Sequence, residues 1–275
     1  MNAAHSTERL PLRDDGDGDE LGATLTHLPL PETRDALGTV LVLPGGGYRV
    51  HADHEAEPVA EFFRGHGFHA AVLRYRLAPH HQHPAMLHDA QRAVRMLRDD
   101  PRYGHGPVAV LGFSAGGHLA ATLATHGETH SDPSDPLLGQ HTARPDAAVL
   151  GYPVIHLAGE HAHGGSGHGL LGVEDYDAPL PMDHEPSLNV DQAVTPETCP
   201  TFCWHTADDA AVPAMNSVAF AQACWRHGVP CELHVFTDGR HGLGMAETHP
   251  PAADWPASAS AFLKRTLARG AASPR

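Results

Sequence analysis

The sequence predicts one α/β domain with a mostly parallel sheet that helices cover on both faces. Three observations predict it. Short apolar runs of strand length alternate along the chain with segments whose apolar residues recur at helical spacing. The 275 residues are 41% hydrophobic, which is enough to build the core of one large domain. A G-x-S-x-G pattern at 112–116 stands between an apolar run and a small-residue run, where a strand would turn into a helix.

The predicted elements follow each other in alternation. Strands are predicted at 39–43, 68–75, 107–111, 147–152, 201–205 and 231–236. Helices are predicted at 59–63, 88–98, 116–124, 217–228 and 257–268. The helix at 88–98 shows the pattern well, because Ala90, Ala93, Val94 and Leu97 fall on one face. Such alternation favours parallel strands with crossover helices.

Two segments depart from this alternation. Residues 1–20 are polar and acidic and lack a basic start with an apolar stretch, so we expect a flexible or loosely docked arm and a cytoplasmic protein. Residues 21–275 are predicted to form a single domain. Within it, residues 159–200 are rich in Gly, Pro and His and have little periodicity, which predicts a lid or substrate-pocket insertion over the carboxyl edge of the sheet.

Charge and cysteine content exclude some classes of partner and of site. The formal net charge is −15, which disfavours binding to nucleic acid and anionic membranes. No apolar stretch approaches the roughly 18 residues of a transmembrane helix. The four cysteines lack C-x-x-C spacing, so we expect free thiols rather than disulfides or a metal site.

Ser114, at the centre of the G-x-S-x-G pattern, is the candidate nucleophile. Glycines on either side allow strand and helix to pass closely, so the serine sits on a strained turn with its hydroxyl exposed above the sheet edge. The helix N-terminus that follows places the Ala115 N–H where an oxyanion would form. The alternative is a Gly-rich turn of some other α/β protein.

A nucleophilic serine needs a base and an orienting carboxylate, in the chain order serine, acid, histidine. Asp208 and Asp209 follow the predicted strand at 201–205, and either could be the acid. His241 follows the strand at 231–236 and has Gly239 and Gly242 beside it, which predicts the base. Both positions lie just beyond a strand end, where the active site of such a sheet belongs.

A Gly-rich loop, Pro44-Gly45-Gly46-Gly47-Tyr48, follows the strand at 39–43. We expect the N–H groups of Gly46 and Gly47 to join that of Ala115 in an oxyanion hole. A generic turn or a nucleotide-binding loop is the alternative, but neither G-x-G-x-x-G nor G-K-[ST] is present. We predict no cofactor and no metal. Four histidines in and just before the insertion leave a zinc site as the alternative, namely His156, His161, His163 and His168.

Five motifs, in order along nearly the whole chain, resemble those of the acetylxylan esterase and feruloyl-esterase-like (BD-FAE) acetyl esterases, relatives of the hormone-sensitive-lipase type. They are LPGGGY at 43–48, LRYRLAP at 73–79, GFSAGGHLA at 112–120, WHTADDAAVP at 204–213 and GRHGLG at 239–244. The resemblance implies the α/β-hydrolase fold. It selects Asp209 as the catalytic acid, because the family's aspartate lies four residues before the proline. The His-rich insertion departs from the family pattern, so the shape of the pocket is not implied.

The resemblance implies a serine esterase that removes short acyl groups, most simply acetyl, from a carbohydrate such as a xylo-oligosaccharide. The substrate would be a small-molecule ester, with no nucleic-acid or membrane partner. The sequence does not indicate an oligomeric state. A peptidase of the prolyl-oligopeptidase type has similar acid and histidine loops, but no propeller-sized domain precedes them here. A hydrolase fold used only for binding is the third possibility, and an incomplete triad would indicate it.

Overall fold

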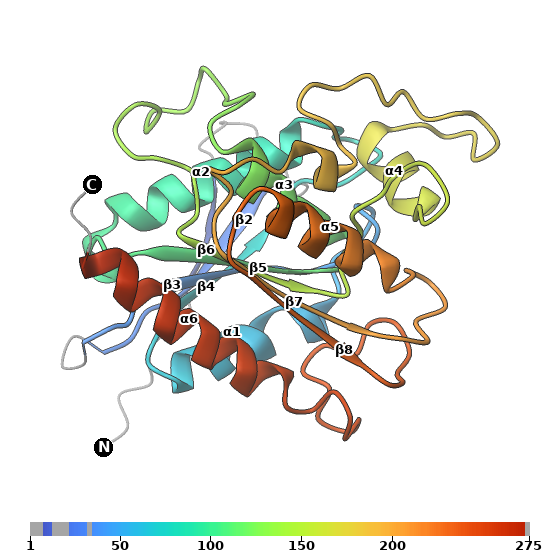
Figure 1. The fold of residues 1–275 in the computed structure, drawn as a ribbon. Helices are drawn as coiled ribbons and strands as arrows, with labels where there is room; N and C mark the ends of the chain where they lie inside the picture. Colours follow the sequence, from blue (N-terminus) through green and yellow to red (C-terminus); the bar gives the residue numbers. More distant parts are fainter. Residues whose placement is uncertain (1–7, 13–21, 32–34, 273–275) are drawn as a thin grey trace.

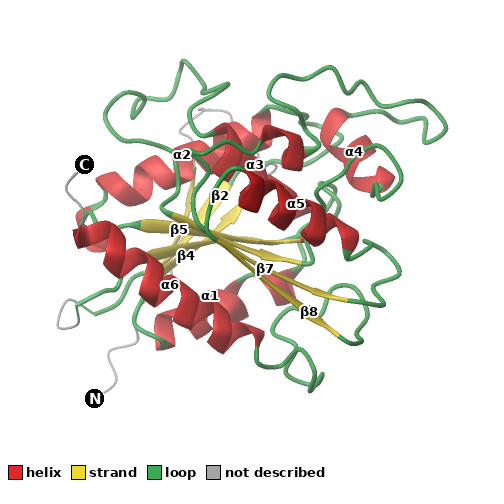
Figure 2. Cartoon of the chain, viewed as in Figure 1, coloured by secondary structure: helices red, strands yellow, loops and turns green. Residues whose placement is uncertain are grey.

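A single eight-stranded sheet runs through the part of the chain that the computed structural model describes, residues 8–12, 22–31 and 35–272 (Figure 1, Figure 2). Its strands are β1 (Glu8–Pro11), β2 (Thr24–Leu28), β3 (Thr39–Leu43), β4 (His69–Arg74), β5 (Val108–Phe113), β6 (Ala147–Gly151), β7 (Thr201–Thr206) and β8 (Cys231–Phe236). They lie in the order β1-β2-β4-β3-β5-β6-β7-β8. The pairs from β4 to β8 are parallel, whereas β1 and β2 are antiparallel to their neighbours.

Helices cover both faces of the sheet. The long helices are α1 (Glu57–Gly65), α2 (Ala85–Asp99), α3 (Ser114–His126), α5 (Met215–Arg226) and α6 (Trp255–Ala272). Figure 1 shows α1 and α6 on one face and α2, α3 and α5 on the other. This arrangement confirms the predicted α/β class.

Burial on both faces explains why the apolar residues of β3 are consecutive. Leu41 and Leu43 pack into the cluster formed with α2, α3 and α5, while Val40 and Val42 pack into the cluster formed with α1 and α6. A strand that is buried on both faces has no polar side, so it reads as an unbroken hydrophobic run.

The N-terminal region differs from the prediction. Residues 8–11, part of the predicted flexible arm, form β1 and pair with β2, a second strand that the sequence pattern did not indicate. Leu12 follows β1 and is buried. Residues 1–7 and 13–20 of the predicted arm lie outside the described residues. Thus the boundary near residue 20 stays a prediction, and at least residues 8–11 belong to the sheet. No helix among the described residues is long and apolar enough to cross a membrane.

The insertion, residues 159–200, contains two short elements, α4 (Gly164–Leu171) and the 3-10 helix η3 (Val190–Ala193). The rest of it is irregular. Figure 1 places α4 on the side of the sheet that α3 and α5 cover.

Candidate active site

Ser114 occupies a sharp turn between strand and helix. β5 ends at Phe113 and α3 begins at Ser114 itself, two residues earlier than the sequence indicated, and Ser114 has a positive φ of 51°. A Cβ atom on Gly112 would lie 2.1 Å from the Gly116 carbonyl oxygen, and one on Gly116 would lie 2.2 Å from that of Leu43. The two glycines of the motif are therefore required because backbones approach closely on both sides of the serine.

Three side chains form a continuous hydrogen-bonded chain at the carboxyl edge of the sheet. The Oγ atom of Ser114 lies 2.8 Å from Nε2 of His241, and Nδ1 of His241 lies 2.6 Å from Oδ2 of Asp209. A carboxylate can only accept, so the Nδ1 proton of His241 points to Asp209. Nε2 is then free to accept the hydroxyl proton of Ser114.

Asp209 is buried, and both of its carboxylate oxygens have partners. Its Oδ1 accepts hydrogen bonds from the N–H groups of Ala211 (2.9 Å) and Val212 (3.0 Å), and its Oδ2 lies 3.4 Å from Nε2 of His205. Burial by itself would raise the pKa of Asp209, yet the hydrogen bonds from His205 and His241 hold that pKa well below its ordinary value. Asp209 therefore stays ionised beside the imidazole.

The neighbouring acid has a different partner. Oδ1 of Asp208 accepts a hydrogen bond of 2.6 Å from the N–H of Gly239, which anchors the start of the loop that carries His241. Asp209, rather than Asp208, therefore accepts the hydrogen bond from the imidazole of His241.

The glycine turn, residues 44–48, lies beside Ser114. Gly46 and Gly47 have φ values of 127° and 64°, in the region that favours glycine. The N–H groups of Gly46, Gly47 and Ala115 donate to no acceptor among the described residues. The N–H of Gly45, in contrast, donates a hydrogen bond of 2.8 Å to the Glu55 carboxylate.

Two residues near the site were not found from the sequence. Glu55 is buried, and its Oε1 accepts a hydrogen bond of 2.6 Å from the Tyr152 hydroxyl. The ring of Tyr152 stands edge-on to that of His241, with centroids 5.0 Å apart. Tyr152 directly follows β6, so its place at a strand end was the signal that could have indicated it.

The insertion reaches the glycine turn through α4. A Cβ atom on Gly169 would lie 2.3 Å from the Gly47 carbonyl oxygen, so α4 packs directly on the turn. His163 caps α4, and its pKa is lowered by burial and then by the charge of His241.

The four candidate histidines have different partners. The rings of His156 and His161 stack with their centroids 6.4 Å apart, and Nε2 of His156 is 3.0 Å from Asp191. His163 bonds Ser166, and His168 stacks on Tyr176. In the described part of the chain, no group of three or more His, Cys, Asp or Glu side chains is placed to hold a metal ion.

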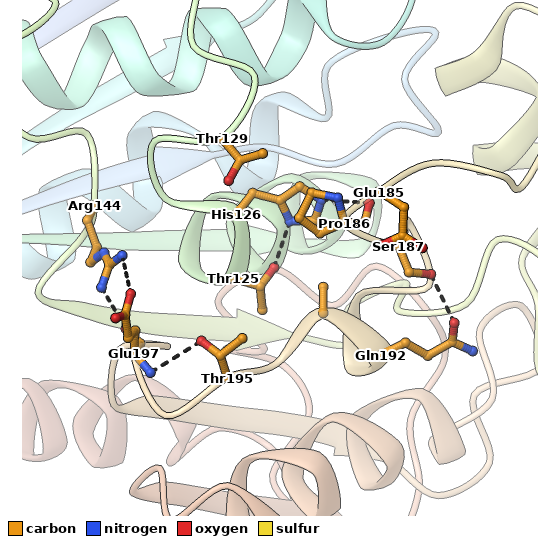
Figure 3. Close-up of a pocket in the computed structure, with 11 residues that line it drawn as sticks. Thr125, His126, Thr129, Arg144, Glu185, Pro186, Ser187, Gln192, Thr195 and Glu197 are labelled. Atoms are coloured by element: carbon orange, nitrogen blue, oxygen red, sulfur yellow. Dashed lines mark hydrogen bonds and ion pairs between the residues drawn. The ribbon is translucent and has the colours of Figure 1, made fainter.

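A polar cavity of about 450 Å³ lies at the far end of α3 (Figure 3). Its lining includes Thr125 and His126, at the end of the helix that begins with Ser114. A helix of that length places them about 18 Å from the serine. Polar groups in the lining pair with one another, as Arg144 does with Glu197 at 2.8 Å. None of Ser114, Asp209 and His241 lines this cavity.

Comparison with known proteins places this chain in a family. The BD-FAE family profile matches residues 27–224. The chain is 36% identical over 215 residues to endo-1,4-beta-xylanase B of Butyrivibrio fibrisolvens, covering 75% of this chain and 32% of that protein. It is 30% identical over 222 residues to an acetylxylan esterase of Xylanibacter ruminicola, covering 78% of this chain and 43% of that protein. The chain thus spans less than half the length of these two curated relatives.

A solved structure matches over nearly its whole length. The acetyl ester-xyloside bifunctional hydrolase from Caldicellulosiruptor lactoaceticus overlaps with a TM-score of 0.84 and 38% identity, covering 96% of this chain and 98% of that one. Together with the sheet order and the strand–serine–helix turn, this match identifies the α/β-hydrolase fold, as expected from the sequence motifs.

Proposed function

This chain belongs to the BD-FAE family, and we propose that it is a serine esterase that removes short acyl groups, above all acetyl, from hydroxyl groups of a carbohydrate. The observation that carries the proposal is the hydrogen-bonded chain from Ser114 through His241 to Asp209. The named relatives support the substrate class, since one is an acetylxylan esterase and another an acetyl ester-xyloside hydrolase.

The first half-reaction acylates the serine. Oγ of Ser114 attacks the ester carbonyl carbon while Nε2 of His241 takes the hydroxyl proton. The carbonyl oxygen becomes an oxyanion, which the N–H groups of Gly46, Gly47 and Ala115 stabilise. Asp209 orients the imidazole and stabilises its positive charge. When the intermediate collapses, the sugar alkoxide leaves and takes the proton from His241.

The second half-reaction removes the acyl group. His241 deprotonates a water molecule, which attacks the acyl carbonyl carbon, and the same N–H groups stabilise the second oxyanion. Collapse releases the carboxylic acid and returns the proton to Ser114. No step uses a group other than these side chains, backbone N–H groups and water.

Two assays test this proposal together. Hydrolysis of p-nitrophenyl acetate measures esterase activity, and acetate release from acetylated xylo-oligosaccharides measures activity on the carbohydrate. We expect both, with loss of both in Ser114→Ala. Activity on the aryl ester alone would retain the esterase and reject the carbohydrate substrate, whereas activity on neither would reject the function.

We also propose a cytoplasmic location. The four cysteines are free thiols in the structure. Contact with the Cys231 thiol, together with burial, raises the pKa of Cys224, so two unjoined thiols lie side by side. Adjacent thiols persist where the compartment is reducing. Fractionation of the source cells tests this, and recovery of the protein outside the cytoplasm would reject it.

A further inference from the structure

We propose that Glu55 is a positioning residue of this site. It holds the glycine turn beside Ser114 and, through Tyr152, holds the loop that carries His241. The inference rests on the proposed esterase function and adds to it a buried carboxylate that contacts no reacting atom.

The first link joins Glu55 to the glycine turn. Glu55 is only 2% exposed, which is rare for a carboxylate unless it is paired. Its Oε2 accepts the N–H of Gly45 at 2.8 Å. A Cβ atom on Gly45 would lie 2.7 Å from that oxygen and 3.0 Å from the Ser114 Cβ. Gly45 is therefore held between the carboxylate and the nucleophile, and Gly46 and Gly47 follow it directly.

The second link joins Glu55 to the loop after β8. Its Oε1 accepts the Tyr152 O–H at 2.6 Å, and the Tyr152 oxygen accepts the N–H of Gly244 at 2.9 Å. Burial, followed by the charge of Glu55, raises the pKa of Tyr152 well above its ordinary value, so the phenol remains a donor. The same ring packs edge-on against His241.

The two carboxylate oxygens thus serve two different loops. One loop is proposed to supply oxyanion donors, and the other supplies the base. Such donors act only when they lie 2.7–3.1 Å from the position of the oxyanion. A misplacement of about 1 Å costs on the order of 10²-fold in rate. Glu55 fixes the spacing between these loops because both of its oxygens are engaged at once.

Glu55→Gln is the main test. It keeps the size of the side chain but replaces one acceptor oxygen by an NH₂ group, which faces a donor. We expect kcat for p-nitrophenyl acetate to fall about 10²-fold, with KM little changed, because the oxyanion forms only in the transition state. Tyr152→Phe should lower kcat about tenfold, and the double variant should lose less than the product of the two, since they share one network.

A matched control separates positioning from stability. Tyr103→Phe also removes a buried tyrosine hydroxyl, which pairs with Nδ1 of His27 at 3.0 Å, away from the triad. We expect Tyr103→Phe to lower the thermal midpoint as Tyr152→Phe does but to keep the wild-type kcat.

Binding of a trifluoromethyl ketone reports the oxyanion site directly. Oγ of Ser114 adds to the ketone carbon, the Ser114 proton moves to His241, and the carbonyl oxygen becomes an oxyanion. In Glu55→Gln the affinity for this ketone should fall by the same factor as kcat/KM. Unchanged kcat and affinity with a lower thermal midpoint would overturn the positioning role. If Glu55→Gln does not fold, a wild-type kcat in Tyr152→Phe would overturn it instead. A wild-type protein that neither hydrolyses the ester nor binds the ketone would reject the proposed function itself.

Discussion

Oγ of Ser114 lies 2.8 Å from Nε2 of His241, although 127 residues separate the two in sequence. The sheet brings them together, because Ser114 follows β5 and His241 follows β8, and parallel strands end at a common edge. Asp209 follows β7 and reaches the far side of the imidazole at the same edge. The relationship between serine and histidine therefore depends on the folded sheet.

Ser114→Ala should abolish ester hydrolysis and leave the fold intact, since it removes the attacking oxygen and almost no packing. The expected loss is on the order of 10³-fold or more in kcat/KM. Steady-state hydrolysis of p-nitrophenyl acetate measures it, and circular dichroism checks the fold. A folded variant with near wild-type activity would show that another residue is the nucleophile.

The two adjacent acids should differ in effect. Asp209→Asn leaves His241 without its orienting charge, and we expect a loss of roughly 10³–10⁴-fold in kcat. Asp208→Asn weakens only the contact with the N–H of Gly239, so its loss should be far smaller. Kinetics of both variants under one set of conditions make the comparison, and the reverse ranking would contradict the assignment.

Stability should depend on pH through buried histidines, two of which belong to α3. Burial lowers the pKa of His118 to about 4 and that of His126 to about 4. In the unfolded chain each has a pKa of about 6.5, so below that pH the unfolded chain binds protons that the folded chain does not. The free energy of unfolding should thus be constant above about pH 6.5 and fall toward about pH 4.

Urea unfolding at a series of pH values measures this dependence. His126→Gln is the control, because it removes one of the histidines whose pKa burial lowers and should make the slope shallower whatever its effect on overall stability. A free energy of unfolding that stays level or rises as the pH falls from about 7 to about 5 would contradict the expectation.

Short acyl groups should be preferred. The packing of α4 on Gly47 supports a pocket that the insertion caps close to the glycine turn. Each added methylene would contribute about 0.8 kcal/mol if it could be buried, so a long tunnel would favour longer esters. We expect kcat/KM to fall steeply from acetyl to octanoyl on one p-nitrophenyl leaving group. A rise with chain length would indicate an open, lipase-like pocket.

The predictable parts of the fold have local signals. The run 39–43 is buried on both faces, and its bounds match those of β3. By contrast, β2 contains His27, which is buried and pairs through its ring with the Tyr103 hydroxyl, 76 residues away. A local pattern does not show such a partner, so β2 was not predicted.

The site, too, has residues that local sequence signals indicate and a residue that they do not. Ser114, Asp209 and His241 each follow a recognisable strand, and the structure brings all three together. Glu55 looks like an exposed charge in the sequence. In the structure it is buried, and its carboxylate accepts a hydrogen bond from Tyr152, 97 residues further along the chain. Its place beside the glycine turn became visible only in three dimensions.

Covalent labelling tests the central role of Ser114 most directly. Diethyl p-nitrophenyl phosphate should react with Oγ of Ser114, forming the O–P bond and releasing p-nitrophenolate. Mass spectrometry after proteolysis should find one diethylphosphoryl group per chain, on the peptide that contains Ser114, with activity lost in proportion and no label in Ser114→Ala. A label on a different residue, or full esterase activity in the protein labelled at Ser114, would contradict the proposed mechanism.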